Sequence, residues 1–363
     1  MTRRWRPGAA GALMALLALA QASSAAGYPD VVAFEGSAFL MGWYAGVAQV
    51  LLEKKVLVPG VTRSAGLSGG AYTLALAHLN YTGAQINGLW QYMFGRNVSI
   101  PRMVQGGVNA LAEPALDQYL PDDISPVQGV MHIALSQLNA NRASLNDSAS
   151  WVINRWDNKV DLKSCLLGTN AIPCFGTAGM FSIFRNQPVI DGGYGNGFPE
   201  LCLDAANKDC FKAGSWVVGP LANHTCDPVK CGKVLYEANC TVAKRTVLRH
   251  SLYKNTQTYV DRWKLWKIKD RCPTTAWGNN TPPNPTPAFV PQGLVTPDLY
   301  PGLYNPLPRW PKDAAEPMLA CEWQNYAMAP PFHQIKDFLE MCYDLGMRDA
   351  EAWHAANAAR LGR

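Results

Sequence analysis

Residues 31–54 (VVAFEGSAFLMGWYAGVAQVLLEK) and residues 61–79 (VTRSAGLSGGAYTLALAHL) decide the fold class. Each stretch opens on a short strand-like run and passes through small residues into a longer run with helical character. The pattern predicts strands at 31–34 and 61–65, and helices over 39–54 and 69–79. Strands that alternate with helices in this way pair in parallel through crossover connections, so we expect an α/β sheet.

The same reading extends to the rest of the chain. Residues 84–140 are expected to be mostly helical with Pro and Gly interruptions, and residues 333–360 to be helical again. The Pro-rich residues 273–311 predict an extended surface loop. Further strands are expected at 151–153, 165–167, 189–190 and 216–218.

The basic, aromatic residues 243–270 predict an amphipathic helix. It could lie on an anionic lipid surface, or it could be an ordinary surface helix with Trp263 and Trp266 buried.

The composition excludes several classes of protein. Of 363 residues, 48% are apolar and 16% charged, which excludes a disordered chain. After the N-terminus no apolar run reaches the ~20 residues of a membrane span, which excludes a multi-pass membrane protein. The formal net charge is +5. Without Arg3, Arg4 and Arg6 it is 29 basic minus 27 acidic residues, or +2, so no nucleic-acid partner is expected.

Residues 1–26 have the pattern of a secretory signal peptide: three arginines, the apolar stretch 9–20, and small residues up to Ala26. An uncleaved anchor helix is the alternative. We therefore expect a protein that is secreted or held in the lumen of the secretory pathway, extracellular or vacuole-like. With no internal repeat or clear linker, residues 27–363 are predicted to form a single domain, with a motif-bearing core at 30–200 and a Cys- and Pro-rich elaboration at 201–363.

Cysteines and sequons agree with this location. All ten cysteines lie between Cys165 and Cys342, and an even number in a secreted chain favours disulfides. The full connectivity stays open; the local candidate pairs are Cys165 with Cys174, Cys202 with Cys210, and Cys226 with Cys231. A metal site at His224, Cys226 and Cys231 is a weak alternative. Six glycosylation sequons begin at Asn80, Asn97, Asn146, Asn223, Asn239 and Asn279.

Three motifs carry chemistry. Gly66-Leu67-Ser68-Gly69-Gly70 is a G-x-S-x-G between an expected strand and helix, where glycines allow a nucleophilic serine to project from a tight turn. The small residues Gly36, Ser37 and Ala38 open the preceding helix, where backbone N–H groups can stabilise an oxyanion. Ile190-Asp191-Gly192-Gly193 is the third, although Asp-Gly is also a plain hairpin turn.

Taken in this order, the three motifs resemble the patatin-like phospholipase family. VAFEGSAFLMGWYAGVAQVLLEK resembles its strand, oxyanion loop and first helix, and RSAGLSGGAYTLAL its nucleophile elbow with Gly66 and Gly70. LLGTNAIPCF and VIDGGYGNGFP resemble the strand-and-turn run that ends in its Asp-Gly-Gly element. The resemblance covers about residues 30–200 and reaches no motif in the C-terminal part.

The resemblance implies a three-layer α/β fold with a mainly parallel sheet, and a Ser–Asp dyad in which Ser68 is the nucleophile and Asp191 the base. It also implies an oxyanion hole at Gly36, Ser37 and Ala38. The activity would be that of a lipid acyl hydrolase, a phospholipase A or acylglycerol lipase, that meets its lipid ester at a membrane or lipid-droplet-like interface. No cofactor or metal is implied.

The chain departs from the family pattern in the oxyanion loop. Ser37 and Ala38 replace two glycines, Leu40 stands at an often basic position, and Met41 replaces a final glycine. A positive φ at either substituted glycine would be strained. Glu35, beside the loop, is expected to point away from the oxyanion.

Two alternatives stay open. The departures allow a non-catalytic glycoprotein of the same fold that binds lipid or serves storage. A Ser-His-Asp α/β-hydrolase would need a histidine downstream of Ser68, for which His333 is the best placed of six.

Overall fold

The computed structural model describes residues 28–95, 107–138, 148–172, 176–177, 181–193, 201–203, 209–215, 297–315, 317–318, 323, 326–327 and 330–361. The expected signal peptide, residues 1–26, lies outside these ranges. So do the expected strand at 216–218 and the expected basic helix at 243–270. In the described residues, no helix is both long and apolar enough to cross a membrane.

Within the described residues, seven strands form one sheet in the order β5-β6-β3-β2-β1-β7, with β4 also paired to β3. The strands are β1 Val31–Phe34, β2 Arg63–Gly66, β3 Met131–Leu138, β4 Ser148–Ile153, β5 Ser182–Phe184, β6 Gln187–Asp191 and β7 Cys210–Ala213. Strands β7, β1, β2 and β3 are parallel, whereas β4 and β6 run antiparallel to β3. Because β5 is antiparallel to β6, it points the same way as β3, so the sheet is mostly parallel.

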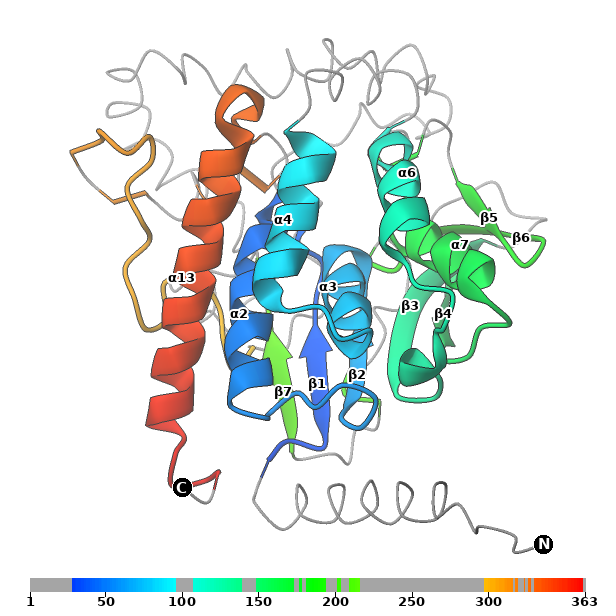
Figure 1. The fold of residues 1–363 in the computed structure, drawn as a ribbon, viewed down its shortest axis with the longest axis horizontal. Helices are drawn as coiled ribbons and strands as arrows, with labels where there is room; N and C mark the ends of the chain where they lie inside the picture. The colour runs from blue at the N-terminus through cyan, green and yellow to red at the C-terminus, as the bar shows by residue number, and fades with distance from the viewer. Residues whose placement is uncertain are drawn as a thin grey trace, which may run out of the picture.

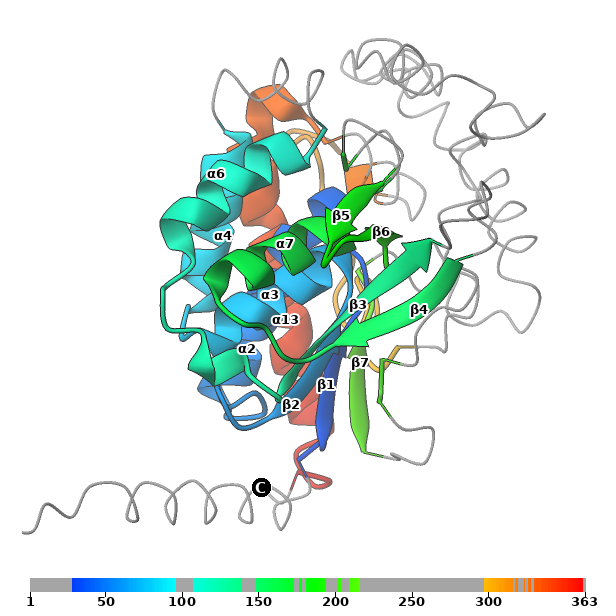
Figure 2. The same ribbon diagram turned by 90° about the vertical axis from the view of Figure 1, so that its right-hand side faces the viewer.

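The helices described here pack against one face of this sheet (Figures 1 and 2). Their buried residues join Val32 and Phe34 of β1 in one large apolar cluster. The helices are α2 Met41–Glu53, α3 Ser68–His78, α4 Gly83–Phe94, α6 Asn109–Tyr119, α7 Lys159–Thr169 and α13 Ile335–Ala356, with 3-10 turns η1 Ala38–Leu40, η2 Ser125–Val127 and η5 Phe332–Gln334.

The other face of the sheet carries small side chains. Ala33, Ala65 and Ala134 come from three adjacent parallel strands and form a second cluster with Leu67 and Leu201. No described helix packs against this face, so the described residues show two of the three layers expected.

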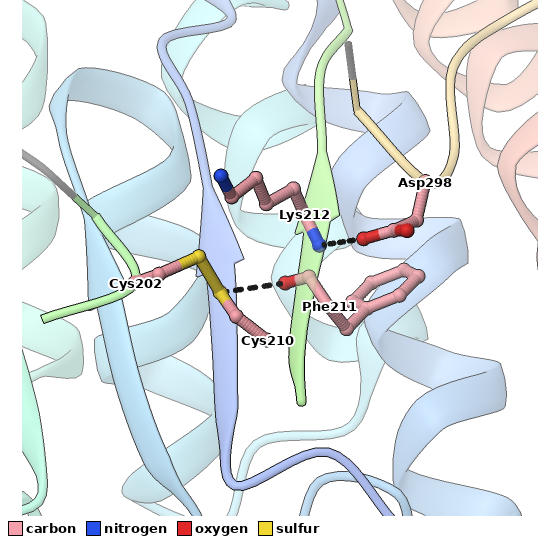
Figure 3. The surroundings of a disulfide bond; sticks show 5 residues. All are labelled: Cys202, Cys210, Phe211, Lys212 and Asp298. Carbon is pink, nitrogen blue, oxygen red and sulfur yellow. Dashed lines mark hydrogen bonds between the residues drawn. A yellow bond between two sulfur atoms is a disulfide. The ribbon is translucent and has the colours of Figure 1, made fainter. Parts of the chain in front are cut away.

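A disulfide joins Cys202, beside Leu201, to Cys210 at the start of β7, and it confirms that predicted pair (Figure 3). In the same figure the backbone N–H of Lys212 donates to Asp298 Oδ2 at 2.8 Å. Residue 298 lies within the Pro-rich segment predicted to be extended, and residues 297–315 contain neither a helix nor a strand.

Glycines let α13, near the C-terminus, pack closely on α2, near the start of the sheet. A Cβ on Gly46 would overlap the carbonyl oxygen of Tyr343, and a Cβ on Gly346 would overlap that of Trp43. Trp43 Nε1 also donates to Asp349 Oδ2 of α13 at 3.0 Å. Burial raises the pKa of Asp349 to about 6, while the hydrogen bond from Trp43 lowers it. The C-terminal helix is thus part of the core.

Several predicted elements are confirmed. Strand β1 has the predicted bounds, while β2, α2 and α3 differ from theirs by one or two residues. Strands were also correctly predicted around 151–153 and 189–190, and the helix at the C-terminus is α13. Asn80, the one glycosylation sequon within the described residues, is exposed at the end of α3. The other five sequons lie outside them.

Three predictions are wrong. Within the described part of 84–140, α4 and α6 are helical as expected, but 131–138 form β3 at the centre of the sheet and not a helix. The expected strand at 165–167 lies inside α7, which Asn158 caps through hydrogen bonds from Val160 N–H and Asp161 N–H. Cys165 is a buried free thiol on that helix, so the expected bridge to Cys174 is not formed. Burial raises the pKa of Cys165 to about 12, which keeps the thiol protonated. Cys174, Cys226 and Cys231 lie outside the described residues.

Candidate active site

The strand register explains how Ser68 and Asp191 meet. Strand β2 ends opposite Ile133 of β3, and β6 pairs with β3 from Leu135 onward. Strand β4 pairs with the opposite edge of β3 over these residues. Strands β2 and β6 therefore pair with the same edge of β3, one after the other. Ser68 begins α3 just after β2, and Asp191 is the β6 residue opposite Leu135. Both residues therefore lie at the junction of β2 and β6.

The turn that presents Ser68 is tight. Ser68 has φ 50°, a left-handed conformation that costs a residue with a Cβ about 1–2 kcal/mol. A Cβ on Gly66 would press on the backbone of Ala71, and a Cβ on Gly70 would overlap the carbonyl oxygen of Glu35. The glycines two positions either side of Ser68 are thus required by close backbone approach. This is the strand–turn–helix geometry expected of the G-x-S-x-G motif.

The polar groups of Ser68 contact the end of α7. Its backbone N–H donates to Thr169 Oγ1 at 2.9 Å, and the Thr169 hydroxyl in turn donates to the carbonyl of Ala134 at 2.6 Å. The Ser68 hydroxyl donates to Asn170 Oδ1 over 3.4 Å, which is a long hydrogen bond. Ser68 is 3% exposed, so these contacts replace water.

Asp191 is buried and held by backbone groups. Its N–H donates to the carbonyl of Ala171 at 3.2 Å, and its Oδ1 accepts from the N–H of Gly193 at 2.8 Å. Its Oδ2 is buried and has no hydrogen-bond partner among the described residues. Burial raises the pKa of Asp191 to about 7, while the N–H of Gly193 and the nearby Ser68 hydroxyl lower it. Ser68 is thus close enough to act on the carboxyl, although the geometry gives its hydroxyl to Asn170.

The loop Gly36–Ala38 packs directly over the Ser68 turn. A Cβ on Gly69 would overlap Ser37 Oγ. The Ser37 side chain therefore fills the space beside Gly69 that a glycine at position 37 would leave open. Ala38 has φ 44°, which is the strain expected where a glycine is replaced. Among the described residues, no acceptor pairs with the backbone N–H of Gly36, Ser37 or Ala38. The loop that contacts the Ser68 turn therefore holds three N–H groups without an acceptor in the described part of the chain.

Glu35 precedes this loop and is 5% exposed. Burial raises its pKa to about 8, and the charge of Lys212 on β7 lowers it. Its Oε2 has no hydrogen-bond partner in the described part of the chain. Below about pH 8 the carboxyl is neutral, so Glu35 would not repel an oxyanion whichever way its side chain points.

The described histidines do not pair with Ser68. His78 is at the other end of α3, where its Nδ1 accepts from Gly60 N–H at 3.1 Å and its Nε2 pairs with Ser64 Oγ at 2.9 Å. Burial, followed by the charge of His132, lowers the pKa of His78 to about 4. His333 is exposed in η5. None of the described histidines is hydrogen-bonded to Ser68 or Asp191, while His224 and His250 lie outside the described residues.

Thr169 and Asn170 were not predicted as site residues. They lie in LLGTNAIPCF, a run quoted above for its resemblance to the family, but neither was singled out as a site residue. Only the tertiary packing of α7 against the Ser68 turn reveals them.

The described residues contain no group of three or more His, Cys, Asp or Glu side chains that could hold a metal ion. The weak candidate at His224, Cys226 and Cys231 is outside them. No protein-family model matches the chain, and no curated protein matches it in sequence.

Proposed function

We propose that this protein is a carboxylic ester hydrolase of the patatin-like type, with Ser68 as nucleophile and Asp191 as general base. The observation that carries the proposal is the approach of Ser68, on a strained turn, to a buried carboxyl whose pKa is raised to about 7. An ordinary aspartate, with a pKa near 4, is a poor base for an alcohol. A base whose pKa lies near the working pH is far more effective.

The reaction would proceed in two halves. The Ser68 oxygen attacks the ester carbonyl carbon while its proton passes to Asp191, and a tetrahedral oxyanion forms. The carbon–oxygen bond to the leaving alcohol then breaks, and the alcohol takes the proton from Asp191. Water attacks the acyl-enzyme by the reverse sequence and releases the acid.

The loop over Ser68 supports the electrostatic part of this mechanism. Its N–H groups at Gly36, Ser37 and Ala38 have no acceptor among the described residues, and the N-terminus of α3 adds its positive end. Preorganised donors of this kind are worth about 3–4 kcal/mol each when they face a developing oxyanion.

The substrate class and the location are part of the proposal. The family resemblance favours a lipid acyl ester met at a membrane or lipid-droplet-like interface, and the N-terminal pattern favours a secreted or lumenal protein.

The experiment is labelling with an alkyl fluorophosphonate, followed by assays of fatty-acid release from phospholipid, galactolipid and acylglycerol vesicles. Wild-type protein should be labelled at Ser68 and should release fatty acid. Ser68→Ala and Asp191→Asn should each lose both signals. Ser64→Ala is the matched control, because Ser64 is equally buried but pairs with His78. A Ser68→Ala variant that still releases fatty acid would refute the proposal.

A non-catalytic lipid-binding or storage protein of the same fold is the second candidate. It is favoured by the burial of Ser68 and by its hydroxyl lying on Asn170 and not on Asp191. Folded wild-type protein that binds lipid vesicles but is not labelled at Ser68 would support this candidate.

A further inference from the structure

Three consecutive residues at the end of α7 hold both members of the proposed dyad. Thr169 Oγ1 accepts from the Ser68 backbone N–H, and Asn170 Oδ1 accepts from the Ser68 hydroxyl. The next residue, Ala171, accepts the backbone N–H of Asp191 through its carbonyl. The relative position of nucleophile and base therefore depends on this short segment as much as on the sheet.

The orientation of the Asn170 amide is fixed by a chain of hydrogen bonds. The carbonyl of Leu167 can only accept, and Asn109 Nδ2 donates to it at 2.9 Å. Asn109 therefore presents its oxygen to Asn170, whose Nδ2 donates to it at 3.0 Å. Asn170 must then present its own oxygen to Ser68. The Ser68 hydroxyl therefore faces the oxygen of the Asn170 amide and not its NH₂ group.

The Ser68 proton thus has two competing acceptors. The Ser68 hydroxyl donates to Asn170 Oδ1, while the neighbouring Asp191 carboxyl has a buried oxygen, Oδ2, without a partner among the described residues. We propose that Asn170 is a positioning residue that holds the Ser68 hydroxyl in a resting orientation. The hydroxyl must turn from Asn170 Oδ1 to Asp191 Oδ2 before Ser68 can act as a nucleophile. This inference rests on the proposed function of the Ser68–Asp191 pair.

The turn of the Ser68 hydroxyl from Asn170 to Asp191 is favoured when Asp191 is ionised and not when it is protonated. The bond to Asn170 spans 3.4 Å between two neutral groups and is weak. An ionised carboxylate is a stronger acceptor than an amide oxygen, so ionisation of Asp191 favours the turn. The titratable side chain that interacts with Asp191 from α3 is Tyr72, and it is neutral because burial raises its pKa further. Among the described residues, no charged side chain contributes to the pKa of Asp191. Apart from the N–H of Gly193, the Ser68 hydroxyl is therefore the polar group that affects this pKa.

The test measures the ionisation of Asp191 directly, by carbon-13 NMR of protein labelled at its aspartate carboxyl carbons. Asp191→Asn identifies the Asp191 signal by its disappearance. Asn170→Ala should lower the titration midpoint by about half to one pH unit, since the freed hydroxyl can stabilise the carboxylate. Asn170→Leu, which also lacks an acceptor but fills more of the space, should shift the midpoint in the same direction if the alanine variant is unstable.

A double-mutant cycle separates this effect from water entering a cavity. In a Ser68→Ala background, Asn170→Ala should leave the midpoint unchanged, because no hydroxyl remains to be released. Asn154→Ala is the matched control, as Asn154 is a partly buried asparagine that pairs with His132 away from Ser68. A midpoint that does not fall in Asn170→Ala, or that falls equally in the Ser68→Ala background, would overturn the inference.

The measurement does not depend on catalysis. If fluorophosphonate labelling fails but the cycle shows coupling through Ser68, the proposed function is wrong while the hydrogen-bond exchange stands. If labelling succeeds but the cycle shows no coupling, only the role of Asn170 is wrong.

Discussion

The Ser37 hydroxyl lies against Gly69, in the space that a Cβ on Gly69 would occupy. The side chain that replaces a glycine in the proposed oxyanion loop thus depends on a glycine in the Ser68 turn. The two loops pack against each other at these residues, so a substitution in one loop should alter the packing of the other.

Gly69→Ala should therefore destabilise the protein by about 1–3 kcal/mol through overpacking, and should slow fluorophosphonate labelling of Ser68. Adding Ser37→Gly removes the overlapping atoms and should restore much of both losses. Denaturant unfolding and labelling rates measure the two effects. Purely additive effects in the double variant would mean that the two loops are not coupled.

Ala38→Gly should leave stability unchanged or raise it by up to about 1.5 kcal/mol. Relief of the left-handed strain at φ 44° gains about 1–2 kcal/mol, and the added freedom of the unfolded chain offsets about 0.4–1 kcal/mol of it. Ala48→Gly, at a buried position inside α2, should instead cost about 1 kcal/mol. Thermal unfolding compares them, and equal losses in both variants would contradict the strain at Ala38.

Asp191→Asn should flatten the pH dependence of stability. The folded-state pKa of about 7 lies above the ordinary value of 3.8 for an aspartate, so the folded protein binds the proton more tightly than the unfolded chain. Wild-type stability should fall as pH rises from about 4 to 7, by up to about 4 kcal/mol, and then level off. The asparagine variant should lack this contribution and, if the proposed function holds, the ester hydrolase activity as well. Unfolding free energies measured across this range decide it, and parallel curves would argue against the raised pKa.

Gly46→Ala should destabilise the protein by about 1–3 kcal/mol, because the new Cβ would overlap the Tyr343 carbonyl of α13. Gly88→Ala in α4 is the control. A Cβ there meets nothing within 4 Å, so the change should stabilise the protein by about 0.5–1 kcal/mol through helix propensity. Opposite signs in urea unfolding are expected, and a neutral Gly46 variant would show that the helices can separate at little cost.

Local pattern was sufficient for the first part of the fold. Strand β1 and helices α2 and α3 have strong apolar runs bounded by small or charged residues, and they were predicted nearly to the residue. Strand β3 was missed because MHIALSQL contains Met, Ala and Leu, which favour helix, and only one β-branched residue. Its place between β2 and β4 overrides that preference.

The error at α7 had the opposite cause. Leu166 and Leu167 suggest a short buried strand, but Asn158 caps the preceding turn and starts a helix through them. An Asn before a Lys-Val-Asp turn is a usable signal that the apolar run concealed.

The candidate site divides in the same way. The sequence motifs pointed to Ser68, Asp191 and the loop at Gly36–Ala38, because each lies among small residues that mark a turn in the sequence. Thr169 and Asn170 act through contacts between distant segments, and no spacing in the sequence encodes them. The position of β6 next to β2 could not be predicted either, because both strands pair with β3 and β3 was not recognised as a strand.

The close contact between α2 and α13 has a consequence for synthesis in the cell. Ile335 follows Glu53 by 282 positions, so a ribosome adding about 5–20 residues per second needs roughly 15–55 s to make the partner of a helix it has already released. During that interval the glycine-lined surface of the nascent helix is bare, and chaperones or translocation factors that shield apolar segments would have their greatest influence on yield there.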